Sequence, residues 1–255
     1  MRVVIKIGTS TLAHKTGKLN IRAFEELTKV ISNLKNSGVE VILVSSGAIG
    51  MGAGKLGLIG KPKDIPTKQA AAAIGQCELM YMYDKYFGEY HHTVAQMLIT
   101  ANDFEDSEKH NNLANTLARL LELQVLPIVN ENDTVSTAEL SIGDNDTLSA
   151  LVAIDAKADL LILVSDIEGL YTADPHKCKN AKLISVVENI DDVLSLGEGS
   201  VSVLGTGGMN TKLQAAKLVT NAGIDMVITN GANPQLLYDI VDGKKVGTRF
   251  LKKEK

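Results

Sequence analysis

Short apolar runs recur along the chain, and small or polar residues follow each of them. The runs are rich in Val, Ile and Leu, and they cover residues 3–7, 39–44, 125–129, 160–164 and 226–228. Mainly apolar runs of this length are typical of strands that are buried on both faces of a parallel sheet. The polar residues after each run would then lie at the carboxyl edge of that sheet, where open α/β folds bind their ligands.

Helical patterns lie between the runs. An apolar stripe extends from Ala23 to Leu34, and Gly38 is the expected C′ residue just after that helix. Thr67 is the expected N-cap of a long helix that continues to Phe87.

Two further helices are expected around the leucines of 113–121 and over 209–219. Irregular segments are expected at about 50–66, 131–145 and 170–205. Strands that alternate with helices predict one α/β domain, in which helices cover both faces of a mainly parallel sheet.

Composition narrows the class of protein. The chain has 255 residues, of which 45% are hydrophobic, and this is enough for one sizeable core. Its 26 Lys and Arg residues against 30 Asp and Glu residues, together with the lack of Trp, do not favour a nucleic-acid partner. The first apolar run breaks at Lys6, so we expect neither a signal peptide nor a membrane span there. Cys77 and Cys178 have no metal or disulfide spacing, and we expect reduced thiols and a cytoplasmic location.

A glycine-rich segment at 205–212, GTGGMNTK, precedes one of the expected helices. Its glycines, hydroxyl groups and lysine suit an anion such as phosphate. It does not have the P-loop spacing, because Thr211 and Leu213 flank Lys212 where a P-loop has Gly and Ser or Thr. We therefore predict that Lys212 binds a phosphate through a different loop.

A second glycine-rich segment contains the pattern G-x-G-x-x-G at Gly52, Gly54 and Gly57. This pattern suggests a dinucleotide fingerprint, but the glycines do not open a helix directly after a strand. We expect a flap or a substrate-binding turn there instead.

Lys6 lies inside an apolar strand run, where an unpaired ammonium group is costly. It could reach solvent from an edge strand, but the glycine and hydroxyls of 8–10 favour an anion site. The segment 45–47, Ser-Ser-Gly, stands at a strand-to-helix turn, and a helix N-terminus suits a carboxylate or phosphate. Ordinary capping would need only one of these three residues.

Carboxylates and amides gather at Asp133, Asp144, Asn145 and Asp146. Without His or Cys neighbours they do not resemble a zinc site. They could bind a cationic amine, orient lysines or hold a hydrated Mg²⁺. Capping and turn chemistry are the alternative, above all for Asp144.

Two residues after the strand at 160–164 are also candidates. Asp166 could contact a ribose or a lysine, and Tyr171 could shelter an adenine. Each residue also fits a turn.

Taken in order, these motifs resemble those of the amino acid kinase family. The matching stretches are VIKIGTSTL, LVSSGAIGMG, QAAAAIGQ, QMLIT, VNENDTVSTAEL, GDNDTLSALVA, SDIEGLYTADP, LGTGGMNTKLQAA and VGTRF. They cover almost the whole chain, and such an ordered set is more specific than any single motif.

The resemblance is strongest with the members that phosphorylate the side-chain carboxylate of L-glutamate with ATP at the start of proline synthesis. It implies a three-layer α/β/α sandwich around a mainly parallel sheet of about eight strands. It also implies Mg²⁺ carried by ATP, proline as a feedback inhibitor, and a homodimer or homotetramer. We expect neither nucleic acid nor a membrane as a partner.

The resemblance also implies roles for individual residues. It makes Lys6 and Lys212 the catalytic phosphate-binding lysines, and Asp146 the carboxylate that organises them. The implied ATP-binding positions are Lys6, Gly8, Ser165, Asp166, Thr206, Gly207, Gly208, Met209, Asn210, Thr211 and Lys212. The implied glutamate-binding positions are Ser46, Gly47, Ala48, Asn130, Asp133 and Asn145.

Many bacterial members of the family carry a further C-terminal domain that resembles the PUA RNA-modification module. The matched motifs end at residue 250, and we expect residues 1–255 to form one kinase domain without it. Two alternatives remain for the function. One is a kinase of the same fold for aspartate, acetylglutamate, carbamate or UMP, and the other is a non-catalytic sensor of nucleotide or amino acid.

Overall fold

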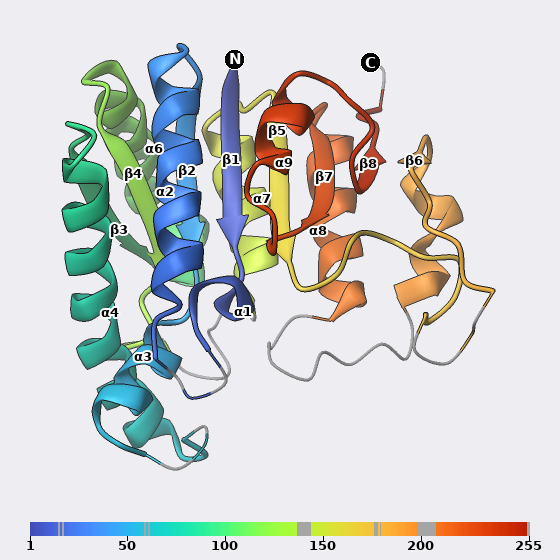
Figure 1. Ribbon diagram of the computed structural model, residues 1–255. Helices are drawn as coiled ribbons and strands as arrows, with labels where there is room; N and C mark the ends of the chain where they lie inside the picture. Colours follow the sequence, from blue (N-terminus) through green and yellow to red (C-terminus); the bar gives the residue numbers. More distant parts are fainter. Residues whose placement is uncertain are drawn as a thin grey trace.

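Eight strands form one sheet in the computed structural model, which describes residues 1–14, 16, 18–58, 60, 62–136, 144–175, 178, 180–197 and 208–253 (Figure 1). The order across the sheet is β3-β4-β2-β1-β5-β7-β8-β6, and only the β7–β8 pairing is antiparallel among the described strands. The strands are β1 (Arg2–Ile7), β2 (Glu40–Ser45), β3 (Val94–Ile99), β4 (Leu126–Glu131), β5 (Leu160–Ser165), β6 (Val186–Val187), β7 (Asp225–Asn230) and β8 (Thr248–Phe250).

The five apolar runs correspond to β1, β2, β4, β5 and β7, so these predicted strands are confirmed. Sequence patterns did not predict β3, β6 and β8. Gln96 interrupts the apolar residues of β3, which lies at one edge of the sheet, and β6 and β8 have only two and three residues.

Nine α-helices lie in the described part of the chain. They are α1 (Thr9–Leu12), α2 (Ile21–Asn36), α3 (Ala48–Lys55), α4 (Ile65–Gly88), α5 (Ala101–Glu105), α6 (Ser107–Glu122), α7 (Asn145–Asp155), α8 (Met209–Asn221) and α9 (Leu236–Val241). Two 3₁₀ turns, η1 (Ile190–Asp192) and η2 (Leu194–Gly197), follow β6.

The helices form a layer on each face of the sheet (Figure 1). Helices α2, α4 and α9 bury their apolar side chains on one face, and α6, α7 and α8 bury theirs on the other. Because side chains alternate along a strand, Val3 and Ile5 of β1 belong to the first core and Val4 to the second. The expected three-layer α/β/α sandwich is confirmed.

Helix boundaries were predicted less well than strands. Gly38 does follow α2, with a φ of +93° that favours glycine. The prediction that Thr67 caps α4 is wrong, because Asp64 is the N-cap and its side chain accepts from the backbone N–H of Thr67. Pro66 is the second residue of the helix, and proline is common in a first turn because its missing N–H group is not needed there.

The flap or turn expected at Gly52 and Gly54 is also wrong, because both glycines lie inside α3. A Cβ on Gly52 would lie 1.8 Å from the carbonyl oxygen of Ala71 in α4. A Cβ on Gly75 of α4 would lie equally close, 1.8 Å, to the carbonyl oxygen of Ala48. The glycines therefore allow two helix backbones to touch, which is the usual reason for small residues at a close helix contact.

The strand order places a crossover point at β1. The chain runs from β1 to β2 on one side and later fills β5 on the other, so β1 lies between two parallel neighbours. Open sheets bind ligands beyond the carboxyl ends of strands at such a point. The arrow of β1 points to the end of the sheet where α1 and α3 lie (Figure 1).

Candidate active site

The carboxylate of Asp146 bridges two lysines that are distant in the sequence. Its Oδ1 lies 2.7 Å from Nζ of Lys6, and its Oδ2 lies 3.0 Å from Nζ of Lys212. The side chains of Lys6, Lys212 and Asp146 are 11%, 6% and 1% exposed. Lys6 comes from β1 at the centre of the sheet, which excludes the alternative of a lysine on an edge strand.

This ionic cluster controls the charge of Asp146. Burial by itself would raise the pKa of this carboxyl group, but the ammonium groups of Lys6 and Lys212 outweigh burial and hold its pKa below the ordinary value. At neutral pH the cluster therefore contains one carboxylate and two ammonium groups, and its excess positive charge suits an anionic ligand.

Lys212 lies in the first turn of α8, whose N-cap is Gly208. Oγ1 of Thr211 lies 2.9 Å from both Oδ2 of Asp146 and the carbonyl oxygen of Gly208, which ties this turn to the cluster. Met209 and Asn210 form the start of the same turn. The N-terminus of a helix carries partial positive charge, so it adds to the attraction for an anion.

Two residues predicted to bind ATP, Thr206 and Gly207, lie outside the described residues. The other end of the predicted loop, from Gly208 onward, does lie beside Asp146.

The ends of β1 and β5 lie side by side. Gly8 donates its N–H to the carbonyl oxygen of Val164 at 3.1 Å, and a Cβ there would lie 3.2 Å from that oxygen. Ser165 is buried and donates to the exposed carboxylate of Asp166 at 3.1 Å. Ser165 and Asp166 line a hollow of about 520 Å³. The other lining residues are Ser10, Thr11, Asn20, Arg22, Ala23, Glu26, Asn230, Gly231 and Ala232.

Tyr171, a candidate for adenine contact, is half-buried and forms an isolated β-bridge with Leu183. Its hydroxyl group donates to the carboxylate of Glu168. The residue is therefore held in the loop after β5.

The turn after β2 forms a second helix N-terminus. Gly47 is the N-cap of α3 and has a φ of +103°, which explains why glycine stands there. Ser46 precedes it and is half-buried, while Ala48 starts the helix and is buried. This N-terminus lies close to α7, because Asn145 donates to Ser46.

Asn145 connects this turn to α7. Its Nδ2 lies 2.7 Å from the carbonyl oxygen of Ser45, 2.9 Å from Oγ of Ser46 and 3.0 Å from Oδ1 of Asn130. Asn130 is 2% exposed at the end of β4. The structure therefore brings the two asparagines and the serine together, with Asn130 as the inner member.

Asp133 lies just beyond β4, at the same edge. Burial, and secondarily the negative charge of Glu131, raise its pKa to about 6. A cationic ligand would stabilise the charged form of this carboxyl group, because its positive charge would offset both the burial and the repulsion by Glu131.

Asp144 has a capping role. It is the N-cap of α7, and its Oδ1 accepts from the backbone N–H groups of Asp146 at 2.7 Å and Thr147 at 2.9 Å. This is the alternative that the sequence left open for Asp144. It also fixes the turn that carries Asn145 and Asp146.

Sequence reasoning missed two residues of α4 that lie behind the site. Tyr83 of α4 is fully buried, and its hydroxyl lies 2.9 Å from Oγ of Ser45. Gln76 of α4 accepts from Asn130 at 2.9 Å. A signal was present for Gln76, because it is a polar residue within an alanine-rich apolar stretch.

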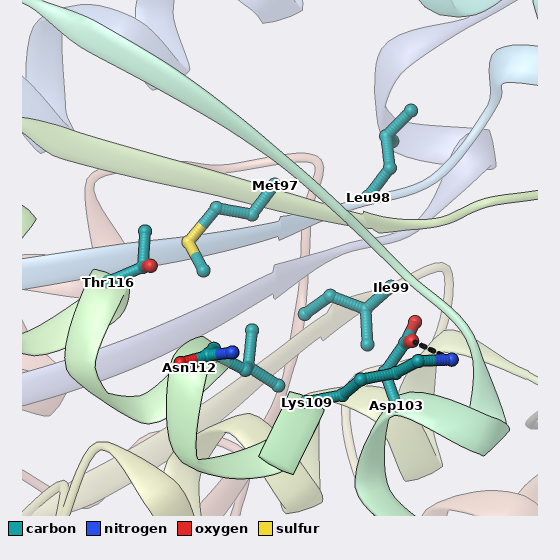
Figure 2. A pocket seen from close by; sticks show the side chains of 8 residues that line it. Met97, Leu98, Ile99, Asp103, Lys109, Asn112 and Thr116 are labelled. Atoms are coloured by element: carbon teal, nitrogen blue, oxygen red, sulfur yellow. Dashed lines mark ion pairs between the residues drawn. The ribbon is translucent and has the colours of Figure 1, made fainter. Parts of the chain in front are cut away.

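Another hollow, of about 340 Å³, lies between β3 and α6 (Figure 2). Met97 and Ile99 line it from the strand, and the ammonium of Lys109 lies 3.8 Å from the carboxylate of Asp103 beside it. Of the predicted site residues that the structure describes, none lines this hollow.

Within the described ranges, no group of three or more His, Cys, Asp or Glu side chains could hold a metal ion. The helices in the same part of the chain include none that is long and apolar enough to cross a membrane.

Known proteins resemble this chain along almost its whole length. Residues 1–230 match the model of the amino acid kinase family. A glutamate 5-kinase of Caldanaerobacter subterraneus subsp. tengcongensis is 53% identical over 252 residues, which are 98% of this chain and 68% of that protein. A glutamate 5-kinase of Clostridium tetani is also 53% identical, over 97% of this chain and 93% of its own length.

Solved structures agree on the fold. Carbamate kinase from Giardia lamblia bound to AMP-PNP aligns with a TM-score of 0.71 at 18% identity, and covers 99% of this chain and 98% of its own. UMP kinase from Bacillus anthracis aligns with a TM-score of 0.68, also at 18% identity, over 99% of this chain and 96% of its own.

Proposed function

The chain belongs to the glutamate 5-kinases of the amino acid kinase family, and we propose that Lys6, Asp146 and Lys212 form its phosphoryl-transfer centre. The reaction moves the terminal phosphoryl group of ATP to the side-chain carboxylate of L-glutamate and gives L-glutamate 5-phosphate, the first step of proline biosynthesis. The observation that carries the residue assignment is the buried Asp146 carboxylate held between two lysine ammonium groups.

The chemistry needs no general base. The attacking group is a carboxylate whose unperturbed pKa is about 4.3, so it is already ionised at neutral pH. The difficulty is to bring two anions together and to stabilise the charge that shifts during transfer.

Lysines and helix N-termini meet this need. Lys212 and the first turn of α8 stabilise the β- and γ-phosphates and the charge that develops on the leaving side. Lys6 holds the transferring phosphoryl group, and Asp146 keeps both ammonium groups in position. The remaining ATP contacts are assigned to Gly8, Ser165, Asp166 and the segment 206–212.

Glutamate binds beside Lys6, at the ends of β2 and β4 and the start of α7. Asp133 pairs with the α-ammonium group, which offsets the burial and the repulsion that raise its pKa. The Ser46-Gly47-Ala48 turn binds a carboxylate, and Asn145 contributes its amide. Asn130 is 2% exposed, and its Oδ1 supports Asn145 from behind through a hydrogen bond of 3.0 Å.

Mg²⁺ accompanies ATP as a counter-ion of its phosphates. The described carboxylates do not form a dedicated metal site, and Mg²⁺ commonly binds through substrate phosphates with few protein ligands. Proline inhibition near the glutamate site, a homodimeric or homotetrameric assembly and a cytoplasmic location stay predictions.

The function is tested by ADP release with Mg-ATP and L-glutamate, with hydroxylamine present to trap an acyl phosphate. Parallel reactions contain aspartate, N-acetylglutamate, carbamate or UMP, and one glutamate reaction also contains proline. We expect hydroxamate with glutamate alone and less of it with proline. Turnover of another substrate would keep the fold but reject the substrate assignments, and ATP binding without turnover would favour a sensor.

A further inference from the structure

Gln76 is a polar side chain on the buried face of α4. It is 8% exposed, and a buried amide is costly unless its polar atoms have partners. Both polar atoms have one. Oε1 lies 2.9 Å from Nδ2 of Asn130, and Nε2 lies 3.3 Å from Oε1 of Gln96 on β3.

The orientation of the Asn130 amide follows from the backbone. Its Oδ1 accepts from the N–H of Glu131 at 2.9 Å, and a backbone N–H can only donate. Nδ2 of Asn130 therefore points to Gln76, which must accept. With Oδ1 of Asn130 held by the Glu131 N–H, the Gln76 amide must present its oxygen to Asn130. In the opposite orientation of Gln76, the NH₂ groups of the two amides would face each other.

The orientation of the Asn145 amide is fixed in the same way. Its Nδ2 lies 2.7 Å from the carbonyl oxygen of Ser45, which can only accept. The same nitrogen lies 3.0 Å from Oδ1 of Asn130. If Asn130 turned over, two NH₂ groups would face each other at this contact. The acceptor on Gln76 therefore adds to the backbone N–H of Glu131 in holding the Asn130 amide so that its Oδ1 faces Nδ2 of Asn145.

Ser46 gains a defined role from this arrangement. Its Oγ lies 2.9 Å from Nδ2 of Asn145, and an amide nitrogen does not accept hydrogen bonds. Ser46 must accept at this contact, so its own proton points elsewhere. The hydroxyl can donate to an incoming carboxylate, while Oδ1 of Asn145 can accept from an incoming ammonium group.

We propose that Gln76 is a positioning residue for glutamate recognition. It acts through Asn130 to keep the Asn145 amide and the Ser46 hydroxyl in the orientations that suit a carboxylate and an ammonium group on one ligand. The proposal rests on the proposed function of this site. It concerns the affinity for the amino acid and not the binding of ATP, which contacts α8 on the far side of Asp146.

Gln76→Met tests the proposal, because it keeps the length of the side chain and removes both hydrogen bonds. The KM for glutamate should rise about ten-fold, as expected when one buried amide is left without a partner, while kcat and the KM for ATP change by less than about two-fold. Gln76→Glu should restore a glutamate KM near that of the wild type. Its carboxyl group still accepts from Asn130, and the exposed amide of Gln96 can turn to face it.

Gln96→Met is the matched control. It removes a partner of Gln76 at an exposed position, where water can replace it, and it leaves the Gln76–Asn130 hydrogen bond in place. We expect a glutamate KM near that of the wild type.

A merely structural Gln76 would lower the amount of folded enzyme and leave the glutamate KM of that enzyme unchanged, which would overturn the proposal. An equal rise in the KM for glutamate and for ATP would overturn it as well. If Gln76→Met does not fold, Gln76→Glu decides the question, because a raised glutamate KM in that variant contradicts the proposed acceptor role. Failure of the wild type to use glutamate would instead reject the proposed function.

Discussion

Asp146 and Asp191 each bridge two lysine side chains, one in the interior and the other at the surface. Asp146 is 1% exposed and contacts Lys6 and Lys212 at 2.7 and 3.0 Å. Asp191 is 49% exposed and contacts Lys217 and Lys253 at 3.4 and 3.5 Å. Each carboxylate carries one negative charge and contacts two lysines, so the two sites differ mainly in burial. Substitution at each site therefore separates the effect of burial from the effect of net charge.

Asp146→Asn should therefore be far more harmful than Asp191→Asn. The first change leaves two ammonium groups close together in the interior, and loss of one partner of a buried pair costs about 3–5 kcal/mol of unfolding free energy. The rate should also fall, on the order of 10²–10³-fold, because neither lysine is held at the phosphates. Urea denaturation and glutamate-dependent ADP release measure the two effects.

Asp191→Asn is the control for this comparison, and it should leave both stability and activity close to those of the wild type.

The lysines hold the pKa of Asp146 below the ordinary value, so the contribution of Asp146 to stability is complete at neutral pH and is lost only as the pH falls through that lowered pKa. Equal effects of the two substitutions at pH 7 would show that burial of the cluster is unimportant.

The two lysines should be needed for the rate. We expect Lys6→Met and Lys212→Met each to lower kcat on the order of 10²–10³-fold, since each removes a charge from the phosphates. Both lysines share Asp146, so the double variant should lose less than the product of the two single losses. Lys217→Met removes an exposed lysine from the same helix as Lys212 and should retain activity. Near wild-type turnover in either single variant would contradict the roles given to that lysine.

The central strands could be predicted because each contains a mainly apolar run, which can be recognised without knowledge of the neighbouring strands. Helix α3 could not be predicted in this way. Its sequence, AIGMGAGK, has three glycines, which lower helix propensity. The helix forms because Gly52 can pack directly against α4, and such tertiary packing overrides local propensity.

The candidate site also contains residues that the sequence could identify and one that it could not. Lys6 was identified because a lysine inside an apolar run needs a partner, Lys212 from its glycine-rich segment, and Asp146 from a cluster of carboxylates and amides. The family resemblance implied that the three act together, and the carboxyl edge of the sheet was the expected place. Gln76 was not identified, because its role depends on how α4 lies against β4. No spacing within one segment reveals that relationship.

Glutamate binding should depend on pH through Asp133. Its raised pKa, about 6, means that the carboxyl group is charged at pH 8 and mostly protonated at pH 5. Protonation removes the partner of the α-ammonium group, so the KM for glutamate should rise about ten-fold between pH 8 and pH 5. Initial rates against glutamate concentration over this range measure the effect.

Two variants identify the titrating group. Asp133→Asn should have a high KM for glutamate without this pH dependence. Glu131→Gln should move the titration to lower pH but only partly, because burial is the larger cause of the raised pKa and the charge of Glu131 the smaller. A pH profile that is unchanged in Asp133→Asn would assign the titration to another group.

The contact between α3 and α4 should limit what can replace Gly75. A Cβ at this position would lie 1.8 Å from the carbonyl oxygen of Ala48 and 2.5 Å from the backbone nitrogen of Gly52, and backbone atoms cannot move aside as a flexible side chain can. Gly75→Ala should therefore cost about 1–3 kcal/mol of unfolding free energy. It should also raise the KM for glutamate, because Ala48 begins the helix that follows Ser46 and Gly47.

Gly88→Ala provides the comparison within the same helix. Gly88 is the last residue of α4, and a Cβ there meets no described atom within 4 Å. Replacement of glycine by alanine at such a compatible position should add about 0.4–1 kcal/mol to stability, because it restricts the unfolded chain. The midpoint of urea denaturation should therefore fall for Gly75→Ala and rise for Gly88→Ala, although the chemical change is identical. If Gly75→Ala were as stable as Gly88→Ala, the two helices would not be in contact at this point, and Gly52 and Gly54 would again require a role in a loop.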